Sequence, residues 1–318
     1  MPDLLLATVP RGYVHRTSVA EVLLTGWEAL PSDDGEPSDA FVVRAQWPRS
    51  HAVFAPVMGR QDPLLLVESI RQAGLLLSHA EYGVPLGYQF LMRDISFTAT
   101  DDAFAHDAVP TDVELLTTCH DIVRRGGVLV GMRYEVSVRR ADRIVAAGGA
   151  RFTCTSPAVY ERLRGGRNQV AHRPSPTPPL APELVGRTSQ EHVLLAAPTT
   201  APDERSRRWE LRVDTGHPVF FDHEVDHVPG MLLIEAARQA VRAATRRPDG
   251  HLITLECTFS RYAELSAPCW VEVTTAGDQQ LMAAATQDGE RVFTAILGLA
   301  GLGAAPNGAG QDLACARF

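Results

Sequence analysis

An internal duplication constrains the fold of this chain more than any other feature of its sequence. Three separated segments recur in the same order in the second half of the chain, as Arg16-Thr17-Ser18 and Arg187-Thr188-Ser189, His51-Ala52-Val53-Phe54 and His217-Pro218-Val219-Phe220, and Glu68-Ser69-Ile70-Arg71-Gln72-Ala73 and Glu235-Ala236-Ala237-Arg238-Gln239-Ala240. The offsets between the copies differ by only a few residues, as expected for two copies of one domain. A period this long indicates two domains and excludes a solenoid.

The length and one unusual stretch support two domains. The 318 residues suit two domains of about 150 residues, each large enough for its own core. Residues 165–182 are polar and rich in proline, which disfavours both helix and sheet pairing. We therefore expect a first domain at 1–164, a linker at 165–182, a second domain at 183–302 and a loose Gly/Ala-rich tail at 303–318.

Each copy contains one long apolar segment with helical character, at 63–82 and at 230–246. Strand-like segments accompany each helix, at 41–46, 90–98, 109–121, 128–139 and 143–155 in the first copy and at 209–213, 252–259, 269–275, 280–286 and 290–297 in the second. One long helix with a wrapping antiparallel sheet is an α+β arrangement. Both helices are apolar nearly all round and are expected to be buried. Their few charged residues must then be paired or face a ligand cavity.

Composition excludes several functional classes. The net charge of -8 argues against general nucleic-acid binding. No apolar run reaches the roughly 18 residues of a membrane span, and the first residues lack a secretion signal, so we expect a cytoplasmic protein. All 30 basic residues are arginine, which excludes a Schiff-base or P-loop lysine. The five cysteines lack the CxxC spacing of a zinc ribbon.

Polar and reactive side chains are densest between His217 and Gly230. Within this run His223-Glu224-Val225-Asp226-His227 matches the HExxH pattern of zinc proteases, which needs a helix to bring both histidines to one face. Pro229-Gly230 follows almost at once, and the helical pattern begins only there. We expect a loop that lines a binding site, with no metal and no cofactor.

The sequence resembles known families at this point. Pro229-Gly230, four apolar residues and then Glu235-Ala236 resemble the start of the buried helix in hotdog acyl-carrier-protein dehydratases. The whole chain is more similar to the AfsA-type γ-butyrolactone biosynthesis proteins, on the motifs Ala45-Gln46-Trp47-Pro48-Arg49, Gly59-Arg60-Gln61-Asp62-Pro63, Gly83-Val84-Pro85-Leu86-Gly87, Gln89-Phe90-Leu91-Met92 and Phe221-Asp222-His223 through Gly230. The resemblance implies a tandem (double) hotdog fold whose two repeats join their sheets as a pseudo-dimer.

The resemblance also implies an activity. It indicates an acyltransferase that moves a β-ketoacyl group from an acyl carrier protein thioester to the hydroxyl of dihydroxyacetone phosphate, making a butenolide precursor of hormone-like signals that control antibiotic production. Dehydration is disfavoured, because the dehydratases place a catalytic histidine where this chain has Phe221. The alternatives are a hotdog thioesterase or dehydratase, and a non-catalytic protein that binds acyl thioesters.

Two equivalent sets of residues fit this chemistry. Attack of a hydroxyl on a thioester needs a base, donors for the developing oxyanion and a cation for the phosphate. Glu235 or Glu68 supplies the base, Arg238 or Arg71 the cation, and the backbone NH groups at Gly230 the oxyanion donors. Further candidates for substrate binding are His223, His217, Asp222, Gln239 and Gln72.

The second copy is the first choice for the reactive site. It retains the Pro-Gly helix start that the first copy replaces with Asp62-Pro63. Glu235 and Arg238 lie at i and i+3 and project from one helix face, and the predicted effect of Glu235→Gln or Arg238→Ala is loss of transfer in a folded protein. A structural salt bridge, which is common at this spacing, is the alternative.

Overall fold

One continuous antiparallel sheet forms the framework of the molecule. The computed structural model describes residues 7–31, 38–165, 177–197, 207–276 and 280–300. The sheet runs in the order β1-β2-β4-β5-β6-β3-β8-β11-β10-β9-β7. Its strands are β1 (Leu24–Ala29), β2 (Ala40–Trp47), β3 (Gln89–Ala99), β4 (Thr111–Arg125), β5 (Val128–Arg140), β6 (Arg143–Thr155), β7 (Arg208–Glu210), β8 (Leu252–Phe259), β9 (Cys269–Thr275), β10 (Leu281–Gln287) and β11 (Glu290–Leu299).

The two halves are joined edge to edge between β3 and β8. Their antiparallel pairing runs from Asp94, opposite Thr258, to Thr98, opposite Thr254. In the order of the sheet, β3 is the outermost strand of the first half and β8 that of the second, so each half provides a single edge to the joint. The expected α+β double hotdog with joined sheets is confirmed.

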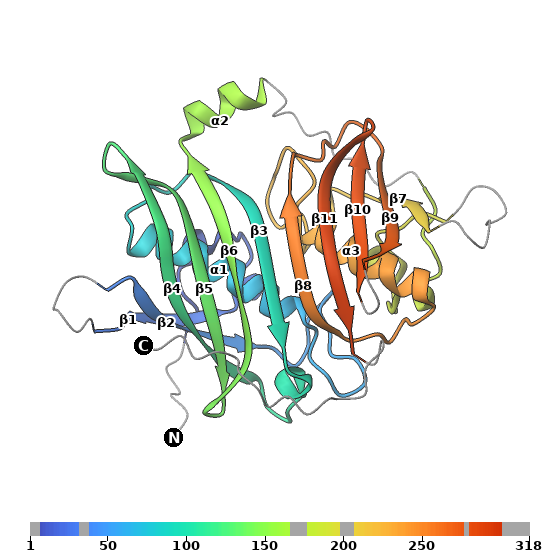
Figure 1. The fold of residues 1–318 in the computed structure, drawn as a ribbon, viewed down its shortest axis with the longest axis horizontal. Coiled ribbons are helices and arrows are strands. Elements are labelled where there is room, and N and C mark those ends of the chain that lie inside the picture. Colours follow the sequence, from blue (N-terminus) through green and yellow to red (C-terminus); the bar gives the residue numbers. More distant parts are fainter. Residues whose placement is uncertain (1–6, 32–37, 166–176, 198–206, 277–279, 301–318) are drawn as a thin grey trace.

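Each half packs one long helix against the sheet. Helix α1 (Leu64–Ala80) and helix α3 (Gly230–Thr245) are buried over most of their length, and Figure 1 shows both against the same face of the sheet. Small residues allow α1 to approach closely: a Cβ at Gly74 would lie 2.5 Å from the Tyr134 hydroxyl, and a Cβ at Gly148 would lie 3.1 Å from Ile70. The polar residues of both helices are thereby enclosed between helix and sheet.

One β-strand and one α-helix were not predicted from the sequence. Strand β1 is half-exposed and short, so it lacks a clear alternation of buried and exposed residues. Helix α2 (Pro157–Arg164) follows β6 directly, with proline at its first position, where the missing N–H costs nothing. It lies beyond one end of the sheet (Figure 1).

The predicted domain boundaries stay predictions. Most of the linker and the whole tail from 303 lie outside the described residues. At the end of the predicted linker, Leu180 N donates to Leu195 O at 2.9 Å, so ordered pairing of the second half begins before residue 183. No helix within the described ranges is long and apolar enough to cross a membrane.

Candidate active site

Two equivalent polar clusters lie on the two long helices. We call Arg16, Glu68, Arg71 and Gln72 the α1 cluster, and Arg187, Glu235, Arg238 and Gln239 the α3 cluster. In the α1 cluster, the Glu68 carboxylate accepts from Arg16 Nε at 3.0 Å, from Arg71 Nε at 2.8 Å and from Gln72 Nε2 at 2.7 Å. Five N–H groups of these three side chains converge on the one carboxylate.

The α3 cluster repeats this geometry. Glu235 accepts from Arg187 Nε at 2.8 Å, from Arg238 Nε at 2.8 Å and from Gln239 Nε2 at 2.7 Å. The structure thus brings together the paired Glu and Arg residues expected from the sequence. It adds Arg16 and Arg187, which the sequence marked only as part of the repeated Arg-Thr-Ser.

The glutamine side chains of both clusters form hydrogen bonds with backbone groups. Gln72 Oε1 accepts from Leu23 N at 3.0 Å, and Gln239 Oε1 accepts from Leu194 N at 2.8 Å. Both glutamines are fully buried. We therefore assign Gln72 and Gln239 to positioning the carboxylates and no longer propose them as substrate ligands.

The two clusters differ in the groups that surround their helix arginines, Arg71 on α1 and Arg238 on α3. Arg238 is fully enclosed, and its Nη1 and Nη2 donate to the Asp62 carboxylate at 2.6 and 2.9 Å. When the two helices are aligned, Asp62 corresponds to Pro229. Proline has no carboxylate that could pair with Arg71. The Arg71 side chain retains 20% exposure, and its hydrogen bonds within the described residues use Nε and Nη2 but not Nη1. Arg71 therefore lies at the cavity wall, with Asp222 close enough to help raise its pKa, whereas Arg238 is bonded directly to the Asp62 carboxylate.

Ion pairing keeps these carboxyl groups charged. Burial by itself would raise the pKa of Glu68, but Arg16 and Arg71 outweigh it and hold that pKa at about 2. Burial opposes ionisation of Asp62 too, and Arg238 lowers its pKa to about 2. The pKa of Glu235 is also lowered, by Arg187 and Arg238 against the effect of burial. The Glu68 and Glu235 carboxylates are already saturated with hydrogen-bond donors, which leaves them little capacity to accept a proton from a substrate.

These depressed pKa values predict acid sensitivity. The folded-state pKa of Asp62 lies below its ordinary value of 3.8, so its contribution, about 2–3 kcal/mol, is present above the ordinary value and is lost as pH falls toward 2. We expect Asp62→Asn to be less stable than the parent protein at pH 7, with the difference closing between about pH 5 and pH 2. Urea unfolding across this range measures it; a difference independent of pH would contradict the assignment.

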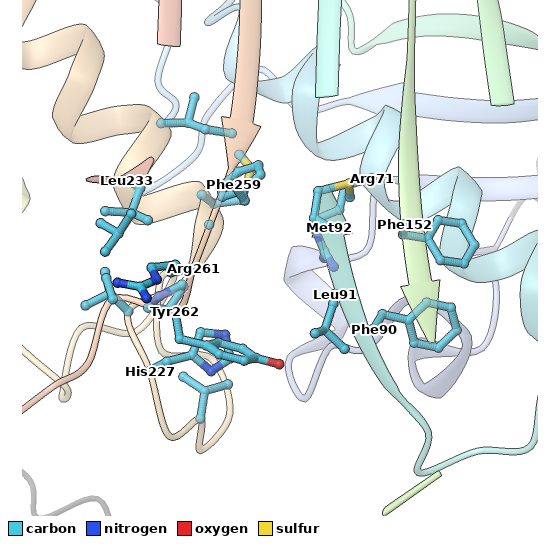
Figure 2. A pocket seen from close by; sticks show the side chains of 18 of the residues that line it. Arg71, Phe90, Leu91, Met92, Phe152, His227, Leu233, Phe259, Arg261 and Tyr262 are labelled. Carbon is cyan, nitrogen blue, oxygen red and sulfur yellow. The ribbon is translucent and has the colours of Figure 1, made fainter. Parts of the chain in front are cut away.

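A cavity of about 720 Å³ lies between the two halves, with Arg71 at its wall. It forms because the pairing of β3 with β8 stops at Asp94 and Thr258, after which the strands separate. Figure 2 shows Arg71, Phe90, Leu91 and Met92 on one side and Leu233, Phe259, Arg261, Tyr262 and His227 on the other. The cavity thus combines arginines, Arg71 and Arg261 among them, with apolar side chains from both halves.

The loop before α3 completes the cavity from the second half. Asp222 accepts from the backbone N–H groups of Thr17 and Ser18, the latter at 2.8 Å, so it fixes this loop to the first half. His223 lines the cavity, with Nδ1 3.6 Å from Asp222 Oδ2. Burial and then Arg16 and Arg71 lower the pKa of His223, which places its ring near both arginines.

His217 has a local role. Its Nδ1 accepts from Val219 N and Phe220 N, both at 3.2 Å, and the ring is buried. It is not among the residues that line the cavity. His217 therefore holds the turn that leads into the loop, and we do not propose that it binds substrate.

Gly230 lies where α3 begins, at the cavity wall. Leu232 N and Leu233 N donate to Pro229 O, so the earlier N–H groups of this first turn, those of Gly230 and Met231, have no acceptor within the helix. A Cβ at Gly230 would lie 3.1 Å from Phe259, so glycine permits close packing here.

The HExxH segment is not helical. It lies in irregular backbone before α3, so its histidines do not share a helix face. His227 Nδ1 lies 2.7 Å from Asp226 Oδ1, and Arg164 of α2 binds both Asp226, at 2.8 Å, and Glu264. Within the described ranges no three His, Cys, Asp or Glu residues are grouped to hold a metal ion.

The joined sheets, the two enclosed helices and a cavity at the joint define a double-hotdog protein. The A-factor biosynthesis hotdog domain matches residues 2–156 and 168–290. The chain belongs to this family.

Relatives and solved structures agree with this assignment. The chain is 48% identical over 301 residues to a 2-oxo-3-(phosphooxy)propyl 3-oxoalkanoate synthase of Streptomyces virginiae, which covers 93% of this chain and 98% of the relative. It is 40% identical to a protein of the same name from Streptomyces coelicolor, covering 91% and 90%. These names support an enzyme.

Solved structures show the fold alone. An acyl-ACP thioesterase from Bacteroides thetaiotaomicron superposes with a TM-score of 0.52 at 11% identity, covering 82% of this chain and 98% of that one. The 12:0-ACP thioesterase from Umbellularia californica gives a TM-score of 0.50 at 12% identity, covering 81% and 96%.

Proposed function

We propose that the chain transfers a β-ketoacyl group from an acyl thioester to the hydroxyl of dihydroxyacetone phosphate. The product is a 2-oxo-3-(phosphooxy)propyl 3-oxoalkanoate, the compound in the names of the relatives. It closes to a butenolide phosphate, the precursor of a γ-butyrolactone-type signal. The donor is an acyl carrier protein thioester, the reaction needs no cofactor, and the cytoplasm is the expected location.

The surroundings of Arg71 give the main support for this proposal. In the α3 cluster, the Asp62 carboxylate occupies the outer side of Arg238. In the α1 cluster, the equivalent space against Arg71 belongs to the cavity. An anion bound there would accept from Nη1 of Arg71, as Asp62 accepts from Nη1 of Arg238, and a phosphate offers several oxygens to the guanidinium. We therefore propose the α1 cluster as the reactive site and reverse the order of preference drawn from the sequence.

The other requirements of acyl transfer lie along the same cavity. The N-terminus of α3 carries a partial positive charge and lies at the cavity wall at Gly230, so its first-turn N–H groups can stabilise the oxyanion of a tetrahedral intermediate. The apolar wall between Phe90 and Phe259 suits the acyl chain, and the cavity volume of about 720 Å³ is that of a small-molecule site. Glu68 then holds Arg16 and Arg71 in position.

Narrowing the apolar wall is expected to shorten the acyl chain that the enzyme accepts. Leu91 is partly exposed and lines the cavity, so Leu91→Trp adds volume there with little strain in the core. Excluding two or more methylene groups, at about 0.8 kcal/mol each, lowers kcat/KM for a long-chain donor about tenfold relative to a short-chain donor. In the control Ile144→Trp, at an exposed site on β6, we expect an unchanged ratio; an unchanged ratio in Leu91→Trp would contradict the placement of the chain.

Mass spectrometry of the products tests the function. Purified protein is incubated with a β-ketoacyl thioester, on acyl carrier protein or on coenzyme A, with and without dihydroxyacetone phosphate. A phosphorylated ester or butenolide that forms only with the phosphate supports the transferase. Free acid would indicate a thioesterase, an enoyl thioester a dehydratase, and an unchanged thioester a binding protein.

A further inference from the structure

His15 adopts a left-handed backbone conformation, which favours glycine. It ends the short helix Arg11–Val14 in the left-handed region, with φ of 51°. Such a conformation is unfavourable for a residue with a Cβ, and residues held in it are concentrated at functional sites. The aligned residue of the second half is Gly186, which ends the helix Pro182–Val185 with φ of 67°.

The surroundings explain why only one half carries a side chain there. A Cβ at Gly186 would lie 2.2 Å from Pro248 O, so nothing larger than glycine fits in the second half. In the first half the same position opens into the cavity, and the His15 ring lines its wall. The α1 cluster therefore has an imidazole nearby, and the α3 cluster has none at the equivalent position.

A chain of hydrogen bonds defines which nitrogen of His15 is free. His79 Nδ1 lies 2.7 Å from Val84 O, and because a carbonyl only accepts, His79 Nδ1 carries its proton. In a neutral ring, His79 Nε2 is then an acceptor. His15 Nε2, at 2.9 Å, must donate to it. The lone pair of His15 therefore lies on Nδ1.

The electrostatic environment keeps the His15 ring neutral before substrate binds. Burial, followed by His79, Arg71 and His223, lowers the pKa of His15 to about 3, and burial lowers the pKa of His79 as well. A phosphate dianion on Arg71 would offset the charge of that arginine and raise the pKa of His15 toward the range of a general base. Both rings are neutral at physiological pH. The effect of Arg71 and His223 on the His15 pKa also places the His15 ring at the cationic end of the cavity.

We propose that His15 is the general base of the transfer, an inference that rests on the proposed function. With the phosphate on Arg71, His15 Nδ1 removes the proton of the acceptor hydroxyl as its oxygen bonds to the thioester carbonyl carbon. The tetrahedral intermediate then collapses, the carbon–sulfur bond breaks, and the leaving thiolate takes the proton back from Nδ1. An ester and a thiol result. His79 acts through His15, as a positioning residue.

The substitution His15→Gly tests this role with the residue that the second half uses. Glycine suits the left-handed backbone, so the melting temperature is not expected to fall. We expect kcat to drop about 10²–10⁴-fold, with little change in KM for dihydroxyacetone phosphate, and added imidazole to restore part of the rate. A structural role would give neither the imidazole rescue nor the separation of kcat from KM.

The outcomes separate this inference from the proposed function. If the parent protein forms no phosphorylated ester, the function fails. If the parent forms the ester and His15→Gly retains more than about a third of kcat, the inference alone fails. A loss in His223→Gln that imidazole rescues, with His15→Gly active, would assign the base to His223 and overturn our assignment.

Discussion

Replacing Arg71 by alanine is expected to lower kcat/KM for dihydroxyacetone phosphate by about 10²–10³-fold. Two charge-assisted hydrogen bonds to a phosphate are worth roughly 3–4 kcal/mol at a half-enclosed site, and each 1.4 kcal/mol is a factor of ten. The fold is expected to survive, because Glu68 retains Arg16 and Gln72. Initial rates over a range of acceptor concentrations, with circular dichroism of the same preparation, measure both effects.

Arg71→Lys provides the matched control. Lysine keeps the charge but loses the planar fork, so we expect a loss intermediate between those of the parent and the alanine variant. The loss in Arg71→Ala is expected mainly in KM for the acceptor, with hydrolysis or binding of the donor thioester unaffected. An unaltered KM in a folded Arg71→Ala protein would show that the phosphate binds elsewhere.

Replacing Arg238 by methionine is expected to destabilise the protein by about 3–5 kcal/mol, because it leaves the buried carboxylates of Asp62 and Glu235 without this partner. Transfer per folded molecule is expected to be nearly unchanged. Urea unfolding and rates corrected for the folded fraction measure the two quantities. The sequence alone favoured the opposite result, loss of transfer without loss of stability.

A second substitution tests the cause of that destabilisation. Exchanging Asp62 for leucine together with Arg238→Met removes both charges of the pair, so we expect the double variant to regain much of the stability lost by the single one. Glu235 keeps Arg187 and Gln239 as partners. A folded Arg238→Met protein with no transfer would instead return the reactive site to the α3 cluster.

The sequence determined much of the architecture by itself. The repeated Glu, Arg and Gln at helical spacing predicted two equivalent buried clusters, because polar groups on an otherwise apolar helix must find partners. The apolar periodicity located α1 and α3 within a few residues of their ends, and the alternation along the strands located most of the sheet. These are local patterns, set by interactions between residues close in the chain. Strand β1 and helix α2 carried too little pattern to be found.

Only the tertiary structure distinguished the two clusters. Asp62 meets Arg238 across 176 positions, Asp222 meets the backbone of Thr17 across 205, and His15 meets His79 across 64. No spacing in the sequence encodes these contacts. Those of Asp62 and Asp222 arise when the edges of β3 and β8 join and bring the two halves together, and that of His15 arises when its loop packs on α1 within the first half. The duplication supplied two arginines in the same setting. The packing of the halves places the Asp62 carboxylate against Arg238. Near Arg71 the equivalent position is a proline, Pro229, so Arg71 lies beside the cavity.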